Sequence, residues 1–154
     1  MCGICGFYGE GGQSVELLLH KIKHRGPDGE GIVRGENYKV GHTRLAIIDV
    51  ENGKQPLYNE DHSLCISFNG EIYNYKDLRN SLKQTHIFQT NSDTEVIIHL
   101  FEEEGIDGLK RLDGMYALAI CSPHMLTLAR DPLGIKPLYI SEKAGGLLFS
   151  SEIK

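Results

Sequence analysis

Apolar residues recur along this chain at two spacings, and each spacing predicts one kind of element. Helical spacing predicts a helix from a Ser14 cap to residue 23, a helix over residues 75–84, a helix from the capping box of Ser92 and Glu95 to a stop at Gly105, and a turn over residues 108–112. Short apolar runs predict strands over residues 4–8, 31–34, 38–50 (interrupted around 42–44), 64–68, 71–73, 115–121, 125–129, 137–140 and 147–150, with a polar loop over residues 51–62. Successive strands with few helices between them favour an α+β fold with mainly antiparallel sheets.

Length and composition narrow the class of protein. The chain has 154 residues, which suits one compact domain, and a net charge of −5 without a run of Lys or Arg, so nucleic acid is not an expected partner. No apolar stretch approaches a membrane span, and no basic segment precedes an apolar run as in a secretory signal. Four cysteines in such a chain are typical of reduced cytosolic thiols, so we expect a cytoplasmic protein without a membrane partner.

Cys2 directly follows the initiator methionine, and this position gives it a chemical use. Methionine can be removed when the next residue is small, and cysteine would then carry both a thiol and a free α-amine. A nucleophile with its own general base attached is the logic of the N-terminal threonine enzymes. Cys2 is therefore a candidate nucleophile once Met1 is lost.

Asn69 and Gly70 lie between two apolar segments and admit two interpretations. Asn-Gly is the strongest short-range signal for a β-hairpin, so a tight turn is the first interpretation. The second is an oxyanion hole, because a side-chain amide beside a glycine N–H offers two donors to a tetrahedral intermediate.

Three charged residues have an ordinary structural interpretation, and two of them, Arg44 and Asp93, also have a binding one. Arg44 could form a salt bridge on an edge strand, or its guanidinium could bind a carboxylate with two hydrogen bonds. Asp93 just inside a helix start suits the helix dipole and could also hold an ammonium group, and Glu71 would ordinarily be a solvated strand residue.

We expect no metal site in this chain. Cys2 and Cys5 form a C-x-x-C pair that could be a redox pair or half a zinc site, but no second pair completes four ligands. In an extended segment these two residues also point to opposite faces. His20 and His24 are four apart on a helix, but no carboxylate or cysteine is spaced to complete a site with them, so we interpret them as surface residues.

Six ordered segments together resemble the class II glutamine amidotransferases. Within that family they are most similar to the N-terminal domain of glutamine-dependent asparagine synthetases. The segments comprise residues 1–4, 24–28, 41–49, 68–74, 92–95 and 130–139, so the resemblance spans nearly the whole chain. Residues 55–57 and 69–74 favour the synthetase branch over the sugar-phosphate and purine-pathway branches.

The resemblance implies an N-terminal-nucleophile fold, a four-layer αββα sandwich of two mainly antiparallel sheets. It implies that Cys2 attacks the side-chain amide of L-glutamine, forms a thioester and releases glutamate and ammonia. It also implies that Asn69 and Gly70 form an oxyanion hole. Arg44, with backbone groups of Leu45 and Ile47 nearby, would bind the α-carboxylate. Glu71 and Asp93 would bind the α-ammonium.

The resemblance also implies that residues 1–154 form one glutamine amidotransferase domain, which works with a partner domain. Family members pass ammonia to an ATP-using synthetase domain with a Ser-Gly-Gly-x-Asp-Ser phosphate loop, which these residues lack. We expect either an excised domain or a stand-alone amidotransferase that works with a separate synthetase, and we consider a homodimer possible. ATP and Mg²⁺ are expected only in the synthetase domain, and no cofactor in this one. Aspartate is the implied ammonia acceptor, with another acceptor or a non-catalytic glutamine-binding module as the alternatives.

Overall fold

The structure is a computed structural model that describes residues 1–154 except 11–13, 144 and 154. Its helical elements are α1 (Val15–Ile22), the 3₁₀ turn η1 (Lys23–Arg25), α2 (Tyr75–Leu82), α3 (Asp93–Glu104) and α4 (Ile106–Leu109). Its strands are β1 (Gly3–Gly9), β2 (Gly29–Arg34), β3 (Tyr38–Arg44), β4 (Leu57–Tyr58), β5 (Cys65–Ile72), β6 (Gly114–Ser122), β7 (Met125–Arg130), β8 (Tyr139–Lys143) and β9 (Gly146–Ser150). No helix in the described part of the chain is both long enough and apolar enough to cross a membrane.

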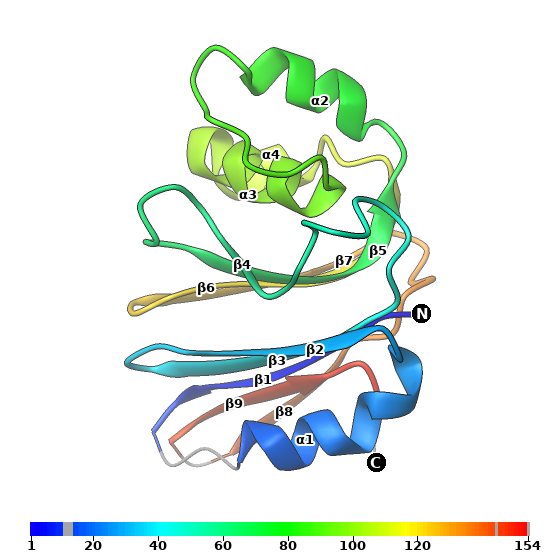
Figure 1. Cartoon of the computed structure of the whole chain (residues 1–154). Helices are drawn as coiled ribbons and strands as arrows, with labels where there is room; N and C mark the ends of the chain where they lie inside the picture. The colour runs from blue at the N-terminus through cyan, green and yellow to red at the C-terminus, as the bar shows by residue number, and fades with distance from the viewer. Residues whose placement is uncertain (11–13, 144, 154) are drawn as a thin grey trace.

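The elements stack in four layers, as the resemblance implies (Figure 1). One sheet has the strand order β2-β3-β1-β9-β8, and the other has the order β4-β5-β6-β7. All strand pairs in both sheets are antiparallel. The two sheets pack face to face, with α1 beneath the first and α2, α3 and α4 above the second. The predicted α+β sandwich is therefore confirmed.

Each interface between layers has its own hydrophobic core. Fifteen buried residues fill the space between the second sheet and its helices, and they include Ile66, Phe68, Ile97, Leu118 and Ile120. A second cluster lies between the sheets, and a third joins α1 to the first sheet. Because β5 is covered on both faces, Cys65 to Asn69 are all buried, although apolar Ile66 and Phe68 alternate with polar Ser67 and Asn69.

The structure corrects several predicted boundaries of strands. The strand predicted over 38–50 ends at Arg44 and is continuous through residues 42–44, and the loop predicted over 51–62 contains β4. Asn69 and Gly70 do not form a turn, because β5 pairs with β6 without a break from Cys65 to Ile72. Long-range pairing decides the conformation here against the local turn signal.

Of the two predicted helix caps, the Ser92 side chain caps α3, whereas the Ser14 side chain does not cap α1. The Ser92 hydroxyl accepts a hydrogen bond from the backbone N–H of Thr94, and α3 ends at Gly105 with a φ of 60°, as expected. The Glu95 carboxylate does not complete the capping box, because it accepts hydrogen bonds from the backbone N–H groups of Gln89 and Thr90. Ser14 makes no capping bond to the backbone; its hydroxyl instead bonds the Glu16 carboxylate.

Candidate active site

One cavity lies where the start of β1, the end of β3, the middle of β5 and the start of α3 come together. Its volume of about 230 Å³ suits a small ligand more than a drug-sized one. Segments far apart in the sequence contribute to its wall. All eight residues singled out from the sequence line it: Cys2, Arg44, Leu45, Ile47, Asn69, Gly70, Glu71 and Asp93.

The Cys2 thiol and the residues around it are held at one side of this cavity by hydrogen bonds to other segments of the chain. Its Sγ accepts a hydrogen bond from the Leu45 N–H at 3.3 Å, and the Arg25 Nε donates to the Cys2 carbonyl at 3.0 Å. The next residues are anchored in β1, where the Ile4 N–H donates to the Ser151 hydroxyl at 2.9 Å. The thiol is therefore partly exposed on a segment whose backbone is fixed.

Residues 24–28 explain how the wall near Cys2 is built. Gly26 packs against β3 so closely that a Cβ at this position would lie 2.3 Å from the Thr43 carbonyl carbon, so only glycine fits. The Asp28 carboxylate accepts a hydrogen bond from the Ala46 N–H at 2.9 Å, and the Asp28 N–H donates to the Arg44 carbonyl at 2.9 Å. This segment sets the path of the chain that carries Leu45 and Ile47 past the cavity.

Cys5 does not act together with Cys2. Its side chain lies in the cluster between β1 and α1, whereas Cys2 lines the cavity. Burial raises the pKa of the Cys5 thiol to about 12, although a backbone hydrogen bond from Gly41 opposes this shift. A thiol of this kind is a poor redox or metal-binding partner, so the structure argues against the C-x-x-C interpretation.

Asn69 brings an unpaired amide to the cavity. Side chains alternate along β5, so Asn69 shares the face of Cys65 and Ser67, which is directed at the other sheet. Its Nδ2 is buried and has no hydrogen-bond partner among the residues that the structure describes. Buried donors without a partner are rare in folded proteins and call for an explanation. A ligand oxygen in the cavity would supply the missing acceptor.

The Gly70 N–H is the second donor on this part of β5. Tyr116, which lies opposite Gly70 in the register, directs both its N–H and its carbonyl to Asp131 and hence away from β5. The pair of Gly70 and Tyr116 is therefore one of the pairs that exchange no hydrogen bonds, and the Gly70 N–H points away from β6. The N–H groups two residues before and after it point the same way and are bonded to the side chains of Gln55 and Asp93.

The neighbouring positions leave the Gly70 N–H facing the cavity beside the Asn69 amide. Glycine is required here by sterics, because a Cβ would lie 2.2 Å from the Met115 carbonyl oxygen. The tertiary structure thus favours the second interpretation of Asn69 and Gly70, a pair of donors for an oxyanion.

The guanidinium of Arg44 lies in the cavity wall at the end of β3, an internal strand and not an edge strand. Three of its hydrogen bonds go to loop carbonyls, those of Ile48, Asp49 and Val50, at 3.3, 2.7 and 2.8 Å. A guanidinium has five N–H donors, so this arrangement leaves two for a ligand carboxylate. The same contacts hold the loop against the cavity.

Glu71 and Asp93 place negative charge at another part of the wall. The Asp93 carboxylate caps β5 by accepting the Ile72 N–H at 3.1 Å, and it is almost fully buried at the start of α3. Burial raises the pKa of Asp93 to about 6, backbone hydrogen bonds oppose the shift, and the nearby charge of Glu71 adds to it. Two carboxylates at this point would be stabilised by a bound cation.

We predict that Asp93→Asn stabilises the fold at neutral pH. The pKa of Asp93 in the folded state lies above its ordinary value of 3.8, so the folded state binds a proton more tightly and stability falls as pH rises from about 4 to 6. An amide at this position can still accept the Ile72 N–H and has no charge to bury. The variant should gain about 3 kcal/mol in free energy of unfolding above pH 6 and nothing near pH 4. Urea unfolding across this pH range measures the difference, and a gain that does not change with pH would contradict the prediction.

Two further residues, Gln55 and Lys136, line the wall without a role predicted from the sequence. The Gln55 side chain bridges β5 and α3, because its Oε1 accepts the Phe68 N–H at 2.7 Å and its Nε2 donates to the Thr94 hydroxyl at 3.1 Å. Lys136 is a buried amine whose Nζ lies 3.6 Å from the Met1 sulfur. Both residues belong to segments that carry the family resemblance, at 55–57 and 130–139, and that was the available signal.

The Asp131 carboxylate explains how Lys136 reaches the cavity. It accepts hydrogen bonds from the N–H groups of Tyr116, Ile135 and Lys136, at 3.2, 2.8 and 3.0 Å. Burial opposes its ionisation, but these backbone donors lower the pKa of Asp131 below the ordinary value. The side chain thereby closes a turn that includes Gly134, whose φ is 65°, and directs Lys136 toward Met1.

The known proteins that this chain is similar to all point to one family. A family model described as a glutamine amidotransferase domain matches residues 1–154. The chain is 42% identical over 165 residues to a probable glutamine-hydrolysing asparagine synthetase of Dictyostelium discoideum, and 44% identical over 163 residues to such a synthetase of Arabidopsis thaliana. Both alignments include the whole chain but only 30% and 28% of the relatives, so the chain spans less than a third of their length.

Two solved structures have the same fold as this chain. A glutamine phosphoribosylpyrophosphate amidotransferase from B. subtilis superimposes with a TM-score of 0.84 at 28% identity, over 98% of this chain and 42% of that one. A second structure, described as the allosteric regulatory enzyme of purine biosynthesis, has a TM-score of 0.81 at 29% identity, with the same coverage.

Proposed function

The chain belongs to the family of glutamine amidotransferase domains, and from this premise we propose how its residues divide the work. The family's activity is the removal of the side-chain amide of L-glutamine as ammonia, and this is the activity of the domain. The observation that carries the assignment of residues is the buried Nδ2 of Asn69, which has no partner in the described part of the chain and lines the same cavity as the partly exposed Cys2 thiol.

In the first step, the Cys2 sulfur attacks the side-chain carbonyl carbon of glutamine. The carbonyl oxygen becomes an oxyanion, which accepts hydrogen bonds from the Asn69 Nδ2 and the Gly70 N–H. Both donors already face the cavity before substrate binds, so they need no reorganisation when the charge develops. The α-amine of Cys2, free after loss of Met1, takes the thiol proton and returns it to the leaving ammonia.

In the second step, water attacks the thioester carbon and releases glutamate and the Cys2 thiol. The amino-acid end of the substrate is held throughout by the two remaining N–H donors of Arg44, which bind the α-carboxylate, and by Glu71 and Asp93, which bind the α-ammonium. Leu45 and Ile47 border the carboxylate with backbone groups. These steps need no cofactor.

Met1 has to be removed for this mechanism. While it is present, the Cys2 nitrogen is an amide and cannot accept a proton, and the Met1 side chain lies in the cavity wall against Lys136. Loss of Met1 frees the α-amine of Cys2 and removes the Met1 side chain from the cavity wall. Intact mass spectrometry of the purified chain reports this state directly.

We further propose that the ammonia serves a synthetase that uses ATP and Mg²⁺ to convert aspartate to asparagine. This proposal rests on the names of the relatives and on the share of their length that lies outside the match. The synthetase would be fused to this domain or supplied as a separate chain. Asparagine formation from aspartate, ATP and glutamine, measured with and without that partner, tests the acceptor separately from glutamine hydrolysis.

The direct test is glutamate and ammonia release from L-glutamine by chain that has lost Met1. Equimolar release of both products supports the proposal. Binding of glutamine without turnover would indicate a glutamine-binding module, unless adding the synthetase partner restores turnover. No binding and no turnover in either setting would contradict the proposed function.

We predict that Cys5→Ser changes stability but not the chemistry. The serine hydroxyl would be buried in the cluster between β1 and α1, which should cost about 1–3 kcal/mol in free energy of unfolding. Glutamine turnover per folded molecule should stay close to that of the wild type. A loss of turnover as complete as in a Cys2 variant would instead support a joint role of the two cysteines.

A further inference from the structure

A second group of reactive side chains lies in the outer helical layer, apart from the cavity. Glu60 comes from the turn after β4, His86 from the connection between α2 and α3, and His99 and Glu102 from α3 itself. Their ligand atoms all lie within 4.8 Å of one another, although the residues span 43 positions of sequence. None of the four lines the active-site cavity.

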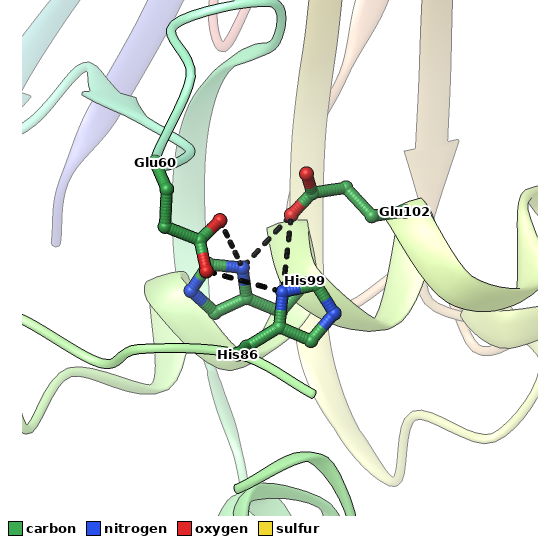
Figure 2. A group of neighbouring side chains, drawn as sticks. All are labelled: Glu60, His86, His99 and Glu102. Atoms are coloured by element: carbon green, nitrogen blue, oxygen red, sulfur yellow. Dashed lines mark hydrogen bonds and ion pairs between the residues drawn. The ribbon is translucent and has the colours of Figure 1, made fainter. Parts of the chain in front are cut away.

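The nitrogen and oxygen atoms of this group converge on one point. Figure 2 shows the two carboxylates directed at the two imidazole rings, which stack with their centroids 4.4 Å apart. The Nδ1 of His86 lies 3.2 Å from Glu60 and 3.8 Å from Glu102. The Nδ1 of His99 lies 3.4 Å from Glu60 and 2.8 Å from Glu102. Both rings therefore present the same nitrogen to the same pair of carboxylates.

These separations match those between the ligands of a tetrahedral metal ion. Bonds of about 2.0–2.1 Å from zinc to nitrogen and oxygen place the ligand atoms of a regular tetrahedron roughly 3.3–3.4 Å apart. The Nδ1 atoms lie 2.8 and 3.8 Å from one oxygen of Glu102, and 3.2 and 3.4 Å from the two different oxygens of Glu60, so the nitrogen–oxygen separations lie on both sides of that value. All four ligand atoms lie within 4.8 Å of one another.

The surroundings of the group are those of a supported metal site. The far nitrogen of each ring meets another carboxylate: the Nε2 of His86 lies 3.1 Å from Glu103, and the Nε2 of His99 lies 3.7 Å from the buried Glu95. Metal-binding histidines commonly direct their other ring N–H to a carboxylate in this way. The Nε2 of His99 is buried and lacks a hydrogen-bond partner among the described residues, and a small shift would bring it to Glu95.

The two carboxylates of the group are also held by their neighbours. The free oxygen of Glu102 accepts a hydrogen bond from the Asn59 Nδ2 at 2.6 Å, and Glu60 accepts the Ile87 N–H at 3.1 Å. Four carboxylates thus surround two imidazoles, which leaves a local excess of negative charge for a cation to offset. Imidazole with carboxylate is a ligand set that suits Zn²⁺ and related divalent ions.

We propose that Glu60, His86, His99 and Glu102 bind a divalent transition-metal ion of the Zn²⁺ type. With four protein ligands the site is closed, as structural metal sites are, so the ion would stabilise the fold and not activate a water molecule. It would join α3 to the turn after β4 and to the connection that precedes α3. The start of the same helix carries Asp93 and Thr94 into the active-site wall, so the ion would also help to hold that wall in place.

The competing arrangement has a proton in place of the metal on each ring. Burial opposes protonation of His99, but the surrounding carboxylates of Glu95, Glu102 and Glu60 together raise the pKa of His99. A protonated His99 between these carboxylates would form an ion-pair network, and a metal ion would have to displace its proton. Metal titration separates the two arrangements.

The test is a titration of the 154-residue chain with Zn²⁺ by calorimetry and with Co²⁺ by visible absorption, at pH 7.5. It is done in a Cys2→Ala background, because the partly exposed Cys2 thiol would itself attract zinc, whereas the other three thiols are buried. We expect one ion per chain, the d–d absorption of tetrahedral Co²⁺, and a midpoint of thermal unfolding about 5 °C or more higher at one hundred times the dissociation constant, reversed by chelator.

Variants of the proposed ligands test whether the ion binds to these residues. Glu102→Gln and His86→Gln should each weaken binding at least about tenfold. The matched control, His124→Gln at an exposed position, should bind as the parent does. Circular dichroism checks that each variant is folded. Absence of stoichiometric binding in the parent, or equal affinity in His86→Gln, Glu102→Gln and His124→Gln, would overturn the proposal. Glutamine turnover of Glu102→Gln with Cys2 intact should remain, which distinguishes this site from the active site.

Discussion

Replacing Cys2 by alanine should abolish glutamine hydrolysis. The thiol is the only described cysteine that lines the cavity, and without it no thioester can form. Loss of the nucleophile from a site of this kind lowers kcat by about 10⁴-fold or more. Glutamate release, followed by chromatography on chain shown by intact mass to have lost Met1, measures the effect.

The same variant should still bind glutamine. Arg44, Glu71 and Asp93 grip the amino-acid end of the substrate in the proposed mechanism, and none of them depends on the thiol for its position. Calorimetry should therefore find a dissociation constant for glutamine in Cys2→Ala near the KM of the active chain. Turnover by Cys2→Ala, free of contaminating glutaminase, would disprove the nucleophile, and loss of binding would show that the thiol also shapes the pocket.

Replacing Asn69 by alanine should lower kcat by about 10²–10³-fold, with a much smaller change in KM. One donor to the oxyanion is removed, and the oxyanion exists only in the transition state and the intermediate. The Nδ2 has no hydrogen-bond partner to lose among the residues that the structure describes, so the midpoint of thermal unfolding should stay close to that of the wild type. Steady-state kinetics with a parallel thermal melt measures both effects.

Ser67→Ala is the matched control for Asn69→Ala. Ser67 is buried on the same face of β5, and its hydroxyl lies 3.1 Å from the His42 Nδ1, away from the cavity lining. The kcat of Ser67→Ala should be nearly unchanged. Its free energy of unfolding should fall because the His42 Nδ1 loses a hydrogen-bond partner. A similar loss of kcat in both variants would mean that Asn69 supports the strand and not the oxyanion.

Local sequence determined the helices that carry the site. Ser92 and Gly105 bound α3 through a hydroxyl that accepts an N–H and a glycine with positive φ, and both effects act within a few residues of sequence. The composition of the strands predicted the α+β class for a similar reason, because alternation and apolar runs reflect burial directly. Family resemblance then identified the eight residues that the structure brings to one cavity.

Tertiary structure decided the conformation and the partners of those residues. Asn69 and Gly70 have the strongest local signal for a turn, yet they lie within a strand because pairing with β6 from Cys65 to Ile72 outweighs a preference of two residues. Only that pairing leaves the Gly70 N–H facing the cavity. Likewise, the sequence predicted a carboxylate-binding Arg44 but not its three bonds to the loop at residues 48–50.

The cluster in the outer layer marks the limit of what the sequence alone determines. His20 and His24, four residues apart, lie exposed on and just after α1, as their interpretation as surface residues predicts, while the converging pair, His86 and His99, is thirteen residues apart. Spacing along one helix predicts neighbours only within that helix. Glu60 and His86 reach His99 because two loops pack against α3, and loop packing depends on the whole hydrophobic core beneath it. The sequence by itself thus determined which elements form and which residues can do chemistry, whereas the packing of distant segments decided which of them meet.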